Sequence, residues 1–71
     1  MNTFSNNLKA LRGEKGLSQK AVACALGIST TCYAGYEQGY REPDLSTFKK
    51  LCLFFETSAD FLLGLKDYDF D

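Results

Sequence analysis

Apolar residues recur at helical spacing through this chain, and the stripes they form are broken at short intervals by residues that end or begin helices. Phe4, Leu8 and Leu11 form the first stripe, which predicts a helix over about residues 5–14 that stops near Gly16. No segment alternates apolar and polar residues as a half-buried strand does. The pattern therefore predicts an all-α fold of short helices with tight connections.

Capping signals delimit the next two helices. Ser18 is a good N-cap for a second helix that Gly27 ends, and Ser29 begins a third helix that runs to about Gln38. Gly39 stands where a left-handed C-cap is favoured. Only two or three residues around Gly27 join these helices, and helices linked so closely pack at a steep angle. We therefore expect a helix-turn-helix.

Two further helices are expected after Pro43, which disfavours helical conformation in the residue before it. Asp44 caps a fourth helix, whose apolar stripe is Leu45, Phe48, Leu51, Cys52 and Phe55. Thr57 or Ser58 begins a short fifth helix that Gly64 ends. The fold class predicted is thus a compact five-helix bundle.

Length and composition limit the classes of function. A chain of 71 residues with 45% hydrophobic residues is expected to make one domain over residues 1–71, with a core over about 5–64 and a short acidic tail over 65–71. No apolar run reaches membrane-spanning length and no signal peptide precedes the first helix, so we expect no membrane partner and a cytoplasmic location. Histidine is absent and no paired acid/base signature stands out, so we predict no catalytic residues and no enzyme.

The three cysteines do not suggest a metal site. Cys24, Cys32 and Cys52 are widely spaced, and a zinc site needs about four nitrogen or sulfur ligands. Reduced structural thiols are the expected state. No metal and no cofactor is therefore predicted.

The net charge of −1 argues mildly against a nucleic-acid partner, but it hides an asymmetry. Residues 1–50 carry seven basic and four acidic side chains, a net charge of +3. Residues 51–71 carry one basic and five acidic side chains, a net charge of −4. This division indicates one surface that faces an anion and another that is turned away from it.

The segment LKALRGEKGLSQKAVACALGISTTCYAGYEQGYREPDLSTFKKL resembles the helix-turn-helix domain of lambda-type phage repressors, Cro proteins and Xre-like bacterial regulators. The matching motifs are LR…GLSQ, ALGIS, YE-Q-G and REP-L, whose order and spacing are more specific than any one of them. The resemblance covers about residues 5–64. It implies a compact bundle of five helices that binds operator DNA as a dimer.

The resemblance implies that the third helix reads bases. Thr30 and Thr31 would present the first side chains to base edges and Gly35 would follow one turn on, with Ala34 and Gln38 on the same face. Threonine offers a hydroxyl to several base edges and a methyl group to thymine, whereas only Gln38 could make a bidentate contact. Ala34 and Gly35 would leave a low surface that approaches the groove, although surface packing that tolerates glycine is an equal alternative.

Phosphate contacts are expected beside this helix. The resemblance assigns one to Gln19, where the N-terminus of the second helix already attracts anions. It assigns others to the loop Gly39, Tyr40 and Arg41 through backbone amides and basic side chains. Lys20 lies on the same side as a further candidate, with a solvated surface charge as the alternative.

Three residues of the inner surface have competing interpretations. Arg12 and Glu37 match a pair that is salt-bridged between the first and third helices, and a phosphate contact by Arg12 is the alternative. Tyr33 and Tyr36 share the inward face of the third helix with Glu37, so we expect them in the core, with base stacking as the alternative.

An apolar patch near the C-terminus is expected to support a homodimer. Its members are Leu53, Phe61, Tyr68 and Phe70, with Phe61 facing outward if Leu62 and Leu65 face inward. Scattered surface hydrophobics are the alternative. A two-fold dimer would read a pseudo-palindromic operator with half-sites about one DNA turn apart.

Two functions of different classes fit these observations. The first is a sequence-specific regulator of transcription that binds double-stranded DNA as a repressor, with a protein antagonist as a further partner. The second is a protein-interaction module on the same fold, with an antirepressor, a toxin or a polymerase subunit as its partner. Positive potential around Gln19, Thr30 and Arg41 would favour the first, and negative potential the second.

Overall fold

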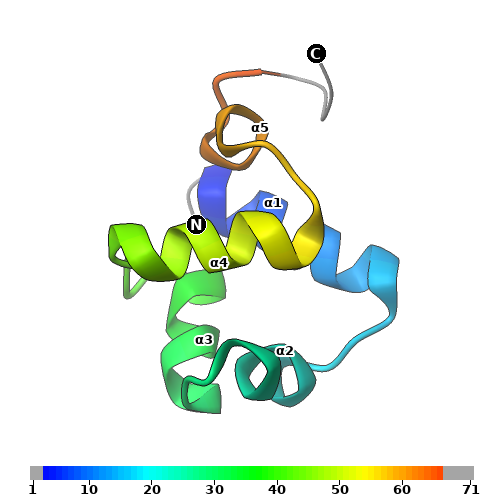
Figure 1. Cartoon of the computed structure of the whole chain (residues 1–71), viewed down its shortest axis with the longest axis vertical. Coiled ribbons are helices and arrows are strands. Elements are labelled where there is room, and N and C mark those ends of the chain that lie inside the picture. Colours follow the sequence, from blue (N-terminus) through cyan, green and yellow to red (C-terminus); the bar gives the residue numbers. More distant parts are fainter. Residues whose placement is uncertain (1–2, 67–71) are drawn as a thin grey trace.

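The structure, a computed structural model, describes residues 3–66 of the chain. These residues fold into five α-helices joined by short turns (Figure 1). Their bounds are α1 (Thr3–Lys15), α2 (Gln19–Leu26), α3 (Thr30–Gln38), α4 (Leu45–Phe55) and α5 (Ala59–Leu63). No strand occurs within these residues, and the predicted all-α architecture is confirmed. α1 packs on α3 and α5, α2 packs on α3 and α4, and α4 also contacts α5.

The helix ends follow the predicted capping signals. Each N-cap side chain accepts a hydrogen bond of 2.8 to 3.1 Å from a backbone amide three residues further on, in α2, α3, α4 and α5: Ser18, Ser29, Asp44 and Ser58. Left-handed glycines close three of these helices: Gly27, Gly39 and Gly64. Glu56 closes α4 with a φ of 53°, a left-handed conformation that the sequence did not indicate.

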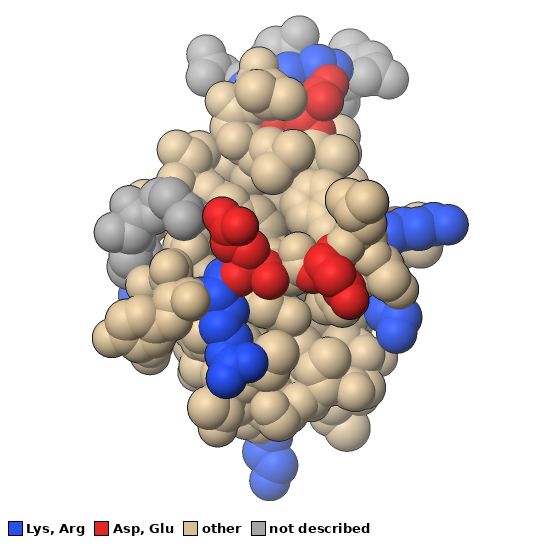
Figure 2. All heavy atoms as spheres, turned by 90° about the vertical axis from the view of Figure 1, so that its left-hand side faces the viewer, with Lys and Arg blue, Asp and Glu red and all other residues tan. Residues whose placement is uncertain are grey.

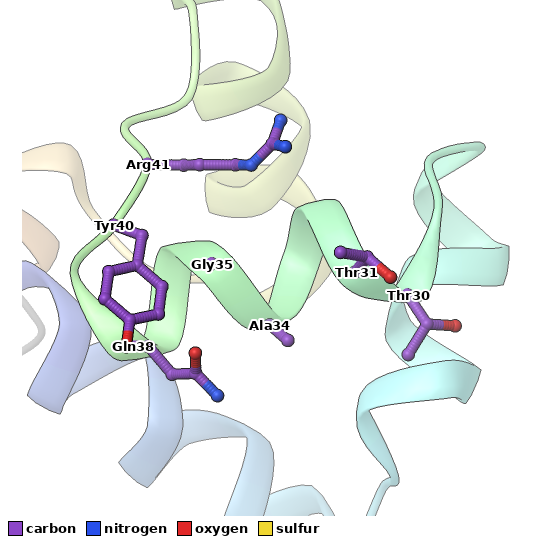
Figure 3. A pocket seen from close by; sticks show the side chains of 7 residues that line it. All are labelled: Thr30, Thr31, Ala34, Gly35, Gln38, Tyr40 and Arg41. Atoms are coloured by element: carbon purple, nitrogen blue, oxygen red, sulfur yellow. The ribbon is translucent and has the colours of Figure 1, made fainter.

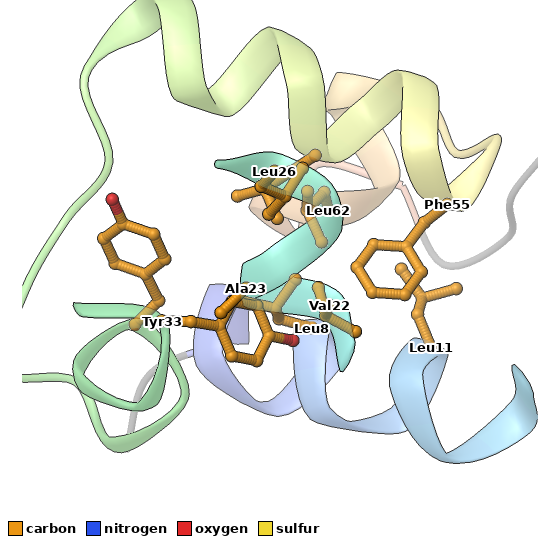
Figure 4. Close-up of a cluster of buried hydrophobic side chains, with 10 residues drawn as sticks. Leu8, Leu11, Val22, Ala23, Leu26, Tyr33, Phe55 and Leu62 are labelled. Carbon is orange, nitrogen blue, oxygen red and sulfur yellow. The ribbon is translucent and has the colours of Figure 1, made fainter. Parts of the chain in front are cut away.

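The core draws side chains from all five helices (Figure 4). Its buried apolar members are Leu8, Leu11, Val22, Ala23, Leu26, Tyr33, Tyr36, Leu51, Phe55 and Leu62. Full burial of a valine, leucine or phenylalanine side chain stabilises a fold by roughly 1.5–3 kcal/mol before entropy is counted. The core therefore holds α2 and α3 in one fixed arrangement on α1.

Two leucines that the sequence placed on inward faces, Leu45 and Leu65, are exposed in the structure. Leu45 is 87% exposed, because the first turn of α4 extends past α3 and only from Phe48 onward does this helix meet the core (Figure 1). Leu65 is 72% exposed, because it lies after the glycine that ends α5. Leu62 faces inward as expected and is fully buried.

Two polar side chains of α1 tie the bundle together. The buried Ser5 hydroxyl donates to the Tyr36 carbonyl oxygen at 2.6 Å, and Asn7 Nδ2 donates to the Phe61 carbonyl oxygen at 2.9 Å. Carbonyls in the last turn of a helix lack partners within it. Ser5 therefore supplies a donor to a carbonyl in the last turn of α3, and this bond fixes the position of α3 along α1.

Candidate nucleic-acid interface

The connection between α2 and α3 is a tight turn of three residues, 27–29. Gly27 adopts φ 73° and ψ 28°, and the amide of Ile28 donates back to the Ala23 carbonyl at 3.0 Å. Ser29 then caps α3 by accepting from the Cys32 amide at 3.0 Å. Both helix ends at the turn are thus satisfied locally, and the start of α3 is presented at a defined angle to α2.

The inner face of α3 is closed off by packing. Tyr33, Tyr36 and Glu37 are buried, with exposed fractions of 0%, 5% and 3%. The two tyrosine rings meet edge to face, with ring centroids 6.2 Å apart. The expectation that both tyrosines belong to the core is confirmed, and neither ring is available to stack on a base.

Glu37 is the centre of a polar cluster that fastens α3 to α1 and α2. Arg12 Nε lies 2.6 Å from Glu37 Oε2 and Arg12 Nη2 lies 3.1 Å from Oε1, so the ion pair expected from the sequence is present and bidentate. Arg12 Nη1 also donates to the Leu17 carbonyl at 2.8 Å. Gln19 Nε2 completes the cluster by donating to Glu37 Oε1 at 3.0 Å.

The pKa values reflect this cluster. Burial alone would raise the pKa of Glu37, but hydrogen bonds from Arg12 and Gln19 outweigh burial and hold the pKa below its ordinary value. The hydrogen bond with Glu37 raises the pKa of Arg12. The Tyr33 hydroxyl has no hydrogen-bond partner among the described residues, and burial, followed by the nearby Glu37 carboxylate, raises its pKa. The cluster is therefore ionised as a pair at neutral pH.

The outer face of α3 lines an open hollow of about 500 Å³ (Figure 3). The hollow brings together seven residues that the sequence divided between base and phosphate contacts: Thr30, Thr31, Ala34, Gly35, Gln38, Tyr40 and Arg41. Thr30, Thr31 and Gln38 are exposed, and Tyr40 is 82% exposed. The helix and the loop after it thus form one continuous surface.

Of the two interpretations of Gly35, a low surface for the groove and a glycine that packing tolerates, the structure supports packing. Gly35 is buried, because the side chain of Arg41 lies across it (Figure 3). A Cβ atom at Gly35 would lie 2.9 Å from Arg41 Cδ and 3.0 Å from Arg41 Cγ. Gly35 therefore serves packing against Arg41, whereas Ala34 lines the hollow as a partly exposed side chain.

The remaining predicted phosphate contacts lie outside this hollow. Gln19, the first residue of α2, is partly buried, and its amide nitrogen is already bonded to Glu37. Lys20 and Gly39 are exposed, and Gly39 closes α3 with a left-handed φ of 85°. A phosphate contact by any of these three residues stays a prediction.

The charge around α3 is mixed. Figure 2 shows the side of the molecule that lies on the left in Figure 1, with small separate acidic and basic groups on a mostly uncharged surface. Residues 19–44 hold two basic and three acidic side chains, one of which, Glu37, is paired with Arg12. No broad cluster of Lys and Arg side chains covers this face, and residues 19–44 carry basic charge at Lys20 and Arg41 alone.

The apolar patch expected near the C-terminus is only partly present. Leu53 is 68% exposed, as predicted. Phe61 is partly buried against the core, so the prediction that it faces outward is wrong: in a five-residue helix the buried Leu62 brings its neighbour against the bundle. Tyr68 and Phe70 lie outside the described residues. Leu63 is also 50% exposed, and it lines a hollow with Phe4, Glu42, Pro43 and Phe48.

The three cysteines are free thiols and differ in exposure. Cys24 is exposed, whereas Cys32 and Cys52 are partly buried. Cys32 Sγ lies 3.4 Å from the Tyr36 hydroxyl oxygen, and burial together with this contact raises the pKa of Tyr36 to about 12. Within residues 3–66, no three His, Cys, Asp or Glu side chains are grouped so that they could hold a metal ion.

The chain is similar in sequence to known proteins. A family described as Helix-turn-helix matches residues 8–62. The chain is 44% identical over 68 residues to YonR, an SPbeta prophage-derived uncharacterized HTH-type transcriptional regulator of Bacillus subtilis, covering 96% of the chain and 63% of the relative. It is 44% identical over 59 residues to the HTH-type transcriptional regulator AnsR of Bacillus subtilis, covering 83% and 51%.

A third relative comes from another organism. The cryptic phage CTXphi transcriptional repressor RstR of Vibrio cholerae is 38% identical over 52 residues, which cover 73% of the chain and 47% of that protein. The chain thus spans about half to two thirds of the length of these relatives. None of its described helices is both long and apolar enough to cross a membrane.

Proposed function

The chain belongs to the helix-turn-helix family, and from the outer face of α3 we propose that it is a sequence-specific DNA-binding regulator of transcription, acting as a repressor. The observation that carries the proposal is a division of α3 into two faces. The inner face is buried, whereas exposed small polar side chains line a hollow on the outer face. The names of the relatives, two regulators and one repressor of transcription, support the same function.

In this proposal α3 enters the major groove with its N-terminal turn foremost. Thr30 and Thr31 offer hydroxyls to base edges and methyl groups to thymine, and Gln38 offers an amide that can bond adenine in two places. Ala34 adds little bulk, so the helix can lie close to the bases. The Arg12–Glu37 pair acts indirectly, because it fixes the orientation of α3.

The phosphate backbone is held from both sides of α3. Gln19 and Lys20 approach one strand from the start of α2, where free amides and the helix dipole favour an anion. Gly39 and Tyr40 approach the other strand from the loop after α3. Such contacts position the protein and carry no sequence information directly.

A homodimer completes the proposal. Leu53 and Leu63 are exposed apolar side chains away from α3, and a second copy would bury them. A two-fold dimer would place two α3 helices about one DNA turn apart on a pseudo-palindromic operator. A repressor of this kind works on DNA in the cytoplasm, and a protein antagonist could act on the same exposed side chains.

Selection from a pool of random duplexes tests the function directly. The protein is expected to enrich one sequence motif, and affinity for the enriched duplex is expected to fall steeply as salt concentration rises. Equal affinity for the enriched and the unselected duplex at low salt would contradict a sequence-specific regulator.

A protein-interaction module is the second candidate, and the mixed charge around α3 favours it. Only Lys20 and Arg41 supply basic charge between residues 19 and 44, where three acidic residues also lie. In this case the hollow on α3 would bind a protein segment instead of a groove. Arg41→Glu would then abolish capture of that protein, and selection from the random pool would enrich no motif.

A further inference from the structure

The outer face of α3 lacks a strong reading group, and the loop that follows places one there. Among the residues of α3 that line the hollow, Gln38 is the single side chain able to make a bidentate base contact. Arg41, which lies three residues beyond the end of α3, lines the same hollow. We propose that Arg41 determines sequence specificity by contacting a guanine, and that Gly35 is the positioning residue that seats it. This inference rests on the proposed DNA-binding function.

Gly35 positions Arg41 in two ways: its carbonyl oxygen accepts hydrogen bonds from the loop, and its lack of a Cβ atom leaves room for the Arg41 side chain. The Gly35 carbonyl oxygen accepts from the amides of Tyr40 and Arg41, at 3.0 and 3.2 Å. The methylene chain of Arg41 then lies where a Cβ atom would be, 2.9 Å from Cδ, 3.0 Å from Cγ and 3.4 Å from Cβ. Any other residue at position 35 would have to displace this chain. The helix-interior glycine, which costs stability, thus has a specific reason.

The guanidinium of Arg41 is available for a ligand. Arg41 is exposed, and its side chain makes no hydrogen bond or ion pair with another described residue. Asp44 is occupied as the N-cap of α4, and Glu42 lines a separate hollow beside Pro43. In Figure 3 the Arg41 side chain runs along α3 from the loop toward Thr31.

The chemistry of this group suits guanine. A guanidinium can donate in parallel to O6 and N7 of guanine, the commonest specific contact in the major groove. Packing of its methylene chain on Gly35 restricts the side chain before binding, so less conformational entropy is lost on contact. A phosphate contact, the role expected from the sequence, would use the same charge but would not need this fixed direction.

Variants at Arg41 separate these two roles. With the duplex enriched from the random pool and its single-base variants, Arg41→Ala is expected to lower the preference for one G·C pair per half-site by about tenfold or more. Arg41→Lys is expected to keep only part of this preference, because lysine can still donate to guanine but lacks the planar fork. Equal weakening on all sequences, with a salt dependence reduced by about one ion, would mark a phosphate contact and overturn the proposal.

Gly35→Ala tests whether Gly35 positions the Arg41 side chain. Alanine favours the helix, so the melting temperature is expected to stay the same or rise, while the preference for the G·C pair falls as it does in Arg41→Ala. Gly13→Ala is the matched control, because Gly13 also lies in a helix and a Cβ atom there meets nothing within 4 Å. This control is expected to raise the melting temperature by about 4–8 °C and to leave the selected motif unchanged.

The double variant decides whether Gly35 acts through Arg41. Gly35→Ala combined with Arg41→Ala is expected to show the same base preferences as Arg41→Ala alone. A further loss in the double variant would mean that position 35 contacts DNA itself and would contradict the positioning role. An enriched motif that neither single variant alters would overturn this inference alone. A pool without enrichment would overturn the proposed function and this inference with it.

Discussion

The inner face of α3 is buried and fully packed, whereas its outer face is exposed. On the inner face, Glu37 makes three hydrogen bonds to Arg12 and Gln19, and the tyrosine rings fill the core. On the outer face, Thr30 and Thr31 are exposed around an open hollow. Nine residues thus carry two tasks, because helical periodicity sends them in opposite directions. Changes on the inner face should alter stability, and changes on the outer face should alter recognition.

Removal of Glu37 should have the largest effect on this division. Glu37→Ala leaves the Arg12 guanidinium without its carboxylate in a largely buried site, and we expect the free energy of unfolding to fall by about 3 kcal/mol. Urea unfolding measures this loss, with Glu14→Ala on the exposed side of α1 as the control. An unchanged midpoint for Glu37→Ala would show that the pair does not secure α3.

Low pH should weaken the same cluster without a mutation, because it protonates Glu37. The pKa of Glu37 is lowered in the folded protein from an ordinary value of 4.5, so the folded state binds fewer protons than the unfolded state. Its contribution to stability is therefore fully present above about pH 4.5, and it is lost as pH falls through the folded pKa. Thermal unfolding between pH 3 and pH 7 should show this acid loss, and Glu37→Gln should flatten it. Identical acid profiles for the two proteins would place the acid-sensitive group elsewhere.

Ser5 should have the next largest effect. Ser5→Ala leaves the Tyr36 carbonyl at the end of α3 without this buried donor, and we expect a loss of about 1–2 kcal/mol. Ser46→Ala on the exposed surface of α4 is the matched control and should change stability by less than about 0.5 kcal/mol. Equal midpoints for the two variants would contradict the role of Ser5 as a tie between α1 and α3.

Thr31 should change stability least and recognition most clearly. Thr31 is exposed on the outer face, so Thr31→Ala should alter the free energy of unfolding by less than about 0.5 kcal/mol. The variant should relax the base preference at one position of the selected motif. A lower melting temperature with unchanged preference would mean that the two faces are not separate.

The local parts of this structure could be predicted from the sequence. Ser18, Ser29 and Asp44 cap their own helices, and Gly27 and Gly39 adopt the left-handed conformation that a C-cap needs, so neighbours in sequence decide these features. The family resemblance implied the Arg12–Glu37 pair, and the place of Arg12 on the apolar stripe of the first helix favoured it over a phosphate contact, since a buried charge needs its partner. All residues of the hollow were named in advance, although as two separate groups.

The features that could not be predicted depend on how elements meet. Arg41 covers Gly35 because the loop folds back on α3, and the path of a loop leaves no periodic signal. Phe61 was expected to face outward if Leu62 and Leu65 face inward, but α5 ends at Leu63 and Leu65 is exposed beyond it. Ser5 gave no sign of burial, since its hydroxyl becomes tolerable in the core only once α3 supplies the Tyr36 carbonyl.

The central claim is that DNA contacts the outer face of α3 while the inner face stays closed. Backbone amide NMR shifts recorded with the selected duplex test this most directly. We predict that the largest shifts fall at Thr30, Thr31 and the loop 39–41, whereas α4 near Leu53 shifts little in a fixed oligomeric state. Largest shifts around Leu53 and α5, with the start of α3 unchanged, would contradict the claim.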